Sequence, residues 1–195
     1  SVQLFRRHRA DAPTEALKAQ FYYARALCRQ GKWQQAAEQA AEVYSAQCRH
    51  YGEHADHDDI AHTLRLQGNI EAMQPATLGE ALPLLEQAAA MFERLHSMHH
   101  AETAYTYTQI AEQYTKQGYV AEAQSVLRST DAVLREQLGS LHPYVAVAQW
   151  RLAECCDMQR QYGEAQAHLA EAERILRERV GEAHPLWLDF WLLSA

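Results

Sequence analysis

The chain has 195 residues, of which 48% are hydrophobic, and this combination allows a buried core and excludes an intrinsically disordered segment. Its net charge of −7 argues against nucleic-acid binding, which needs a basic face for the phosphates. No apolar run reaches the roughly 18 residues that a membrane span requires, and few glycines and prolines interrupt the helix-forming residues.

The four cysteines are expected to be reduced thiols of a cytoplasmic protein, with a redox pair as the alternative. They form no C-x-x-C pair, and neighbouring cysteines on a helix point about 100° apart. No signal-peptide pattern is present, and the first residue is Ser1. We therefore expect an excised piece of a longer protein.

Four segments of the chain repeat one pattern, in which an alanine follows a short break between two helical stretches. These marker alanines, Ala36, Ala81, Ala123 and Ala165, are 45, 42 and 42 residues apart. In chain order, the period predicts the tail of a preceding helix, four helix pairs and a partial or capping helix. Their ranges are 1–12, then 14–50, 58–96, 101–139 and 143–181, and finally 185–195.

Small residues also recur before the markers, where two antiparallel helices are expected to cross closely. Ala24, Ala111 and Ala153 stand twelve residues before their markers, whereas Gly68 stands thirteen before its own. The second pair therefore carries one extra residue, which we place in "QPATL". In the fourth pair, Pro143 suits the opening turn of a helix, and "QYG" is expected to break the chain before the second helix.

These features resemble tetratricopeptide repeats of the longer variety found in kinesin light chains. The residues that carry the resemblance are "TYTQIAEQYTKQGYVAEAQSVL" and "WRLAECCDMQRQYGEAQAHL", together with the turns "GSLHP" and "GEAHP". The resemblance implies an all-α, right-handed superhelix (an α-solenoid) in which the first helix of each pair lines a concave groove. It also implies a non-catalytic module that binds a protein or peptide.

When the groove positions of the family are matched to this sequence, the candidate binding residues lie on the first helix of each pair. Lys18, Arg25, Arg29 and Arg65 would make one half of the groove basic, and Glu112 and Glu154 would make the other acidic. An extended peptide is then expected to bind in one direction, with its acidic part toward the first two repeats. The complete set is Lys18, Phe21, Arg25, Arg29, Arg65, Asn69, Tyr105, Thr108, Glu112, Trp150 and Glu154.

Two other functions remain open. The chain is alternatively a regulatory or oligomerisation segment of a larger signalling protein, and a homodimer could form through the apolar residues 185–195. A metal-dependent enzyme could use the histidine-rich stretch "HYGEHADHDDIAH" at 50–62. We favour a solvated capping loop there, and we expect no cofactor and no enzyme because no catalytic motif is present.

Overall fold

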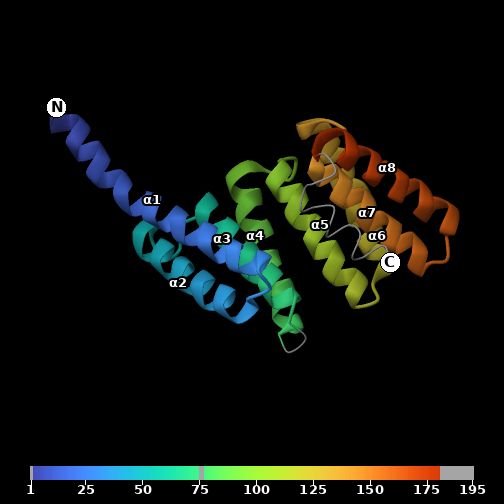
Figure 1. Ribbon diagram of the computed structural model, residues 1–195, viewed down its shortest axis with the longest axis horizontal. Helices are drawn as coiled ribbons and strands as arrows, with labels where there is room; N and C mark the ends of the chain where they lie inside the picture. Colours follow the sequence, from blue (N-terminus) through green and yellow to red (C-terminus); the bar gives the residue numbers. More distant parts are fainter. Residues whose placement is uncertain (1, 75–76, 181–195) are drawn as a thin grey trace. The chain divides into compact units, whose positions relative to one another are not determined.

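The computed structural model describes the backbone of residues 2–74 and 77–180 and the side chains of 13–74, 77 and 79–179. The described residues form α-helices and no strand, which confirms the all-α fold class (Figure 1). We call the odd-numbered helices A-helices and the even-numbered ones B-helices. They are α1 Val2–Arg29, α2 Trp33–Tyr51, α3 Asp58–Ala72, α4 Leu78–His96, α5 Ala101–Lys116, α6 Val120–Leu138, α7 Pro143–Met158 and α8 Tyr162–Val180.

Each A-helix crosses its B-helix at the small residues that the sequence singled out. Ala24 and Ala36 are fully buried where α1 meets α2. In the second hairpin, a Cβ added to Gly68 would lie 3.2 Å from the carbonyl oxygen of Ala81. The extra residue of this hairpin falls in the connection. Five residues, 73–77, separate α3 from α4, which is two more than separate α5 from α6, and α3 is one residue shorter than α5.

The turns within the first, third and fourth hairpins use a left-handed backbone conformation. Gly31 and Gly118 supply it in the first and third hairpins, with φ of 70° and 88°. In the fourth hairpin the expected break at "QYG" is wrong, because α8 already begins at Tyr162 and contains Gly163. Arg160 takes the left-handed conformation instead, with φ of 61°, so the glycine is free to be helical.

The first helix also differs from expectation. We expect a boundary between the tail 1–12 and the first repeat, yet α1 is continuous from Val2 to Arg29 with Pro13 inside it. Proline removes one backbone hydrogen bond, but its fixed φ is compatible with a helix. The division into repeats at 14–50, 58–96, 101–139 and 143–181 therefore remains an interpretation of the helix pairs.

Histidines begin three of the A-helices. The Nδ1 atoms of His57, His100 and His142 accept hydrogen bonds from the backbone N–H groups two residues further on, at 3.1, 3.3 and 3.1 Å. Each bond satisfies a donor that has no partner within the helix. Pro143 follows as the first residue of α7, as predicted. The recurring turn thus ends in a helix cap.

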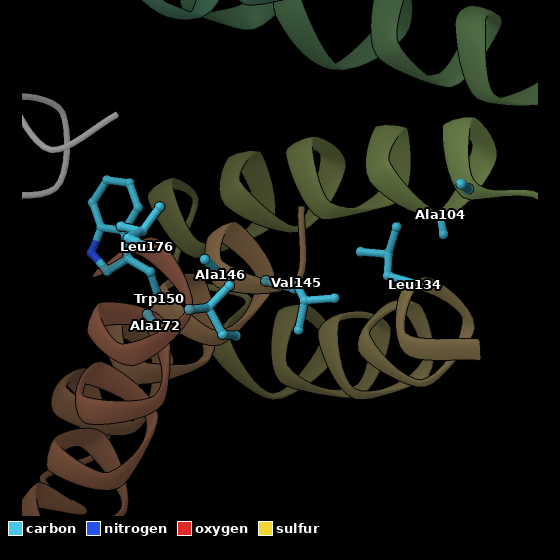
Figure 2. Packing of buried hydrophobic residues seen from close by; sticks show 10 residues of the cluster. Ala104, Leu134, Val145, Ala146, Trp150, Ala172 and Leu176 are labelled. Carbon is cyan, nitrogen blue, oxygen red and sulfur yellow. The ribbon is translucent and has the colours of Figure 1, made fainter. Parts of the chain in front are cut away.

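The chain divides into two compact units, residues 1–95 and 96–195. In unit 1 the described core has one cluster around Ala24, Leu27 and Ile70 and another around Ile60, Leu64 and Ala88. In unit 2, one cluster joins α5, α6, α7 and α8 and includes Trp150 (Figure 2). The clusters of the described residues draw their members from one unit each.

Candidate interaction site

One side of α1 carries exposed basic and aromatic side chains. Lys18, Tyr22, Arg25 and Arg29 follow one another at intervals of four, three and four residues, so they lie along one side of the helix. Phe21 stands beside Tyr22, their ring centroids 5.7 Å apart. We call these five residues the α1 stripe.

The α1 stripe holds uncompensated positive charge. Among the side chains that the structure describes, no carboxylate pairs with Lys18, Arg25 or Arg29. The guanidinium carbon of Arg25 lies 5.9 Å from the ring centre of Phe21 and 5.8 Å from that of Tyr22. Because Tyr22 is 61% exposed, the stripe offers an aromatic surface and free cations to solvent.

A chain of rings connects α1 with α3. Phe21 lies 6.5 Å from the ring of His62, and His62 meets Phe92 of α4 at 5.0 Å. The guanidinium of Arg65 lies over Phe92 at 5.3 Å and contacts Nδ1 of His62 at 3.0 Å. Arg65 is only 9% exposed, so these contacts hold it within the packing of unit 1.

In unit 2, the corresponding aromatic residues are partly or fully covered. Tyr105 of α5 stacks on Tyr144 of α7, with ring centroids 3.8 Å apart and an angle of 9° between the planes. Trp150 is 8% exposed and packs in the core with Ala146, Ala172 and Leu176 (Figure 2). Most of its surface is therefore used for folding.

Glu112 and Glu154, the two glutamates predicted to line the groove, share one arginine. Arg151 of α7 forms ion pairs with Glu112 of α5 and with Glu154, at 2.8 Å for Glu154, and Lys116 also lies 2.8 Å from Glu112. Burial lowers the pKa of Arg151, but the carboxylates of Glu112 and Glu154 outweigh it and raise this pKa overall. Two carboxylates face two cations here, so the cluster has no net charge.

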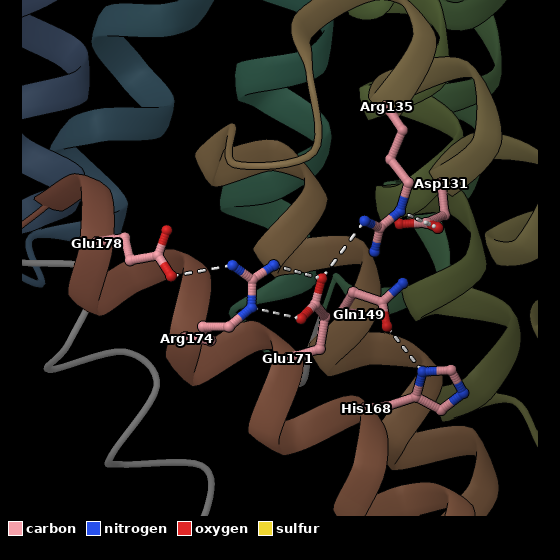
Figure 3. A network of polar contacts seen from close by, with 7 residues as sticks. All are labelled: Asp131, Arg135, Gln149, His168, Glu171, Arg174 and Glu178. Carbon is pink, nitrogen blue, oxygen red and sulfur yellow. Dashed lines mark hydrogen bonds and ion pairs between the residues drawn. The ribbon is translucent and has the colours of Figure 1, made fainter.

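A second polar network lies on the B-helices of unit 2 (Figure 3). Arg135 of α6 pairs with Asp131 at 2.8 Å and reaches Glu171 of α8 at 3.4 Å, and Arg174 joins Glu171 to Glu178. The Arg174 guanidinium is the main reason that the pKa of Glu171 is lowered. This network therefore ties one B-helix, α6, to the next, α8.

Comparison with known proteins identifies the repeats. The family model described as tetratricopeptide repeat matches residues 102–178. The match covers the third and fourth hairpins, α5 to α8, which therefore resemble tetratricopeptide repeats. A solved structure from Podosopora anserina, of TPR-like repeats assigned to a kinesin light chain, is 24% identical over 91% of this chain and 82% of its own, with a TM-score of 0.67. A variant of that protein is 25% identical over the same shares, also with a TM-score of 0.67.

A further solved structure, BtubC (BKLC) from P. vanneervenii, is 20% identical and covers 89% of this chain and 67% of its own, with a TM-score of 0.69. No curated protein matches the sequence. Tetratricopeptide repeats (TPRs) form protein–protein interaction modules, and the match supports a module of this general kind. None of the helices in the described ranges is both long and apolar enough to cross a membrane.

The structure separates the residues predicted for the TPR groove by exposure. Arg65, Thr108 and Trp150 are buried, and the Thr108 hydroxyl bonds to the carbonyl of Ala104 and to Thr130 of α6. These three residues hold their hairpins together. Exposed to solvent are Lys18, Arg25 and Arg29, and partly exposed are Phe21, Asn69, Tyr105, Glu112 and Glu154.

Three residues that contact the predicted groove residues were not identified from the sequence. Tyr22 is the exposed partner of Arg25, and its position four residues after Lys18 is a signal that could have indicated it. Arg151, three residues before Glu154, has the spacing of a helical ion pair. Tyr144 has no comparable signal, because its stacking partner Tyr105 belongs to the preceding hairpin.

The side chains of the histidine-rich stretch contact one another and another part of unit 1. His57 caps α3 and stacks on Tyr51 at 3.6 Å, and the Tyr51 hydroxyl donates to Asp59 at 2.6 Å. Burial, followed by Asp59, raises the pKa of Tyr51 to about 12. Asp56 accepts two hydrogen bonds from Arg94. Within the described ranges, no group of three or more His, Cys, Asp or Glu residues is placed to hold a metal ion.

The apolar segment 185–195, where we expect a capping helix or a homodimer contact, lies outside the described residues. The dimer therefore stays a prediction. The four cysteines lie within the described part and are free thiols there. Cys155 contacts Thr115 of α5 and Cys156 contacts Gln124 of α6, so the adjacent thiols face different helices.

Proposed function

We propose that this TPR module binds an extended acidic peptide of a partner protein along its A-helices, with the α1 stripe as the main contact. The observation that carries the proposal is the set of free cations Lys18, Arg25 and Arg29 beside two aromatic rings. Arginine and aromatic side chains contribute most of the binding energy at protein interfaces. A cytoplasmic location and an adaptor role are part of the same proposal.

The distribution of charge supports an acidic segment rather than a peptide of two opposite halves. The carboxylates of Glu112 and Glu154 are neutralised by Arg151 and Lys116, so a basic segment of the peptide would gain little in unit 2. The partly exposed Asn69 of α3 has an amide that can both donate to and accept from a peptide backbone. Affinity for a short peptide is expected to be about micromolar.

Fluorescence anisotropy with a labelled acidic peptide containing one aromatic residue tests the proposal. Arg25→Glu should weaken binding about tenfold, since it replaces an attractive charge with a repulsive one. The matched control is Arg49→Glu, which makes the same change at an exposed position of the B-helix α2. Equal effects of the two substitutions, or none from Arg25→Glu, would contradict the proposal.

A further inference from the structure

The cap of α7 requires one particular protonation state of His142. Its Nδ1 accepts the backbone N–H of Tyr144 at 3.1 Å, which is possible only when the proton of the neutral ring is on Nε2. A protonated imidazole carries a hydrogen on Nδ1 and would point a donor and a positive charge at the N-terminus of the helix. That end is already positive, so protonation removes the cap and adds repulsion.

The residue held by this cap also covers a proposed binding residue. The Tyr144 ring packs edge-to-face on His142, with centroids 4.8 Å apart, and it also stacks on the ring of Tyr105 at 3.8 Å. Tyr144 is thus held by His142 through its backbone N–H and contacts Tyr105 through its ring. Tyr105 lies on α5, among the A-helix residues proposed to meet the peptide.

We propose that His142 is a proton-sensitive positioning residue, which holds the Tyr144–Tyr105 stack at neutral pH and releases it in acid. Protonation of His142 would then change the position of Tyr105, the residue of α5 that is proposed to contact the peptide. The consequence for binding rests on the proposed function, whereas the coupling of His142 to the stack does not. The group acts through Tyr144 and is not itself a ligand contact.

The charges around His142 set the pH range. Burial, and then Arg179 of α8, lower the pKa of His142, and Glu102 of α5 opposes them without reversing the direction. The folded protein therefore releases this proton more readily than the unfolded chain, whose histidine has a pKa of about 6.5. The stabilisation from the cap is fully present above that pH and is lost as the pH falls through the lower folded value.

The other two histidine caps have different neighbours. At His57, the Asp59 carboxylate lies 3.8 Å from Nδ1 and would pair with a protonated ring, and Tyr51 stacks on its face. His100 stacks on a second imidazole, His96, at 4.3 Å. His142 differs from these two caps because its neighbour Tyr144 stacks on Tyr105, an aromatic residue of the A-helix α5.

Nuclear magnetic resonance of the full chain tests the inference directly. With ¹⁵N-labelled histidine, His142 should be the Nε2–H tautomer at pH 7.5 and should titrate with a midpoint below about 6.5. With ¹³C-labelled tyrosine, the ring signals of Tyr105 should shift with pH at the same midpoint as His142. An Nδ1–H tautomer, or a midpoint at or above about 6.5, would overturn the inference.

His142→Asn separates the cap from its titration, because asparagine is a strong N-cap that does not change charge in this range. The Tyr105 shift should disappear in this variant, and its persistence would overturn the coupling. His168→Gln is the control, since burial also lowers the pKa of His168 but its Nδ1 contacts Gln149 at 2.7 Å. It should leave the Tyr105 shift unchanged. None of these readouts uses the peptide, so failure of the proposed function would not affect them.

Discussion

Among the glycines that the structure describes, Gly68 is the one whose surroundings leave least room for a side chain. A Cβ at this position would lie 2.8 Å and 2.9 Å from two side-chain carbons of Leu85 and 3.2 Å from the Ala81 carbonyl oxygen. The equivalent residues of the other hairpins, Ala24, Ala111 and Ala153, are buried with a methyl group in place. The second hairpin therefore crosses more closely than an alanine would allow without movement.

Gly68→Ala is expected to destabilise the protein by about 1–3 kcal/mol, because the Leu85 side chain must move and the Ala81 carbonyl must give way slightly to accept the methyl group. Gly79→Ala is the control in the same hairpin, where a new Cβ meets nothing within 4 Å. Helix propensity should leave that variant unchanged or more stable by up to about 1 kcal/mol. Urea unfolding followed by circular dichroism measures both. A Gly68→Ala protein as stable as the wild type would show that the close crossing is not needed.

At the scale of the helices, burial decides which ionic contacts matter. Arg151 is surrounded by α5 and α7, and its side chain is 15% exposed. Arg174 also has two ion pairs, both along α8, yet its side chain is 45% exposed. Water competes strongly for exposed charges, so surface pairs contribute little to stability even when their geometry is good.

Arg151→Met should therefore destabilise the protein by about 2–4 kcal/mol, because it removes the cation that the partly buried carboxylates of Glu112 and Glu154 share, although Lys116 remains beside Glu112. Arg174→Met makes the same substitution in the network of Figure 3 and should hardly change the unfolding midpoint. Thermal and urea unfolding of the two variants give the comparison. The ranking would be wrong if Arg174→Met were the more damaging substitution.

At the scale of the whole chain, each core cluster of the described residues has its members in one unit. The cluster that contains Ile70 is formed by residues of α1, α2 and α3, and the cluster that contains Ile175 is formed by residues of α5 to α8. In repeat proteins, stability is close to a sum of local terms and neighbour interfaces. A destabilising substitution in the core of one unit should consequently have little effect on the stability of the other unit.

Ile70→Val and Ile175→Val test this with one chemistry at two sites, since the isoleucines are 1% and 0% exposed. Each substitution should cost about 0.5–1.5 kcal/mol. Hydrogen exchange should then speed up mainly in residues 58–74 for the first variant and in 143–179 for the second. Equal acceleration in both units by either variant would indicate that the chain opens as one block.

The sequence by itself determined the helix pairs, because a close helix crossing favours a small residue and the alanines Ala36, Ala81, Ala123 and Ala165 recur at intervals of 45, 42 and 42 residues. It also placed the α7 start at Pro143. It could not reveal that Thr108 and Trp150 are buried, or that Arg151 neutralises Glu112. Only the tertiary structure decided these points, since burial and ion pairing depend on side chains that packing brings in from another helix.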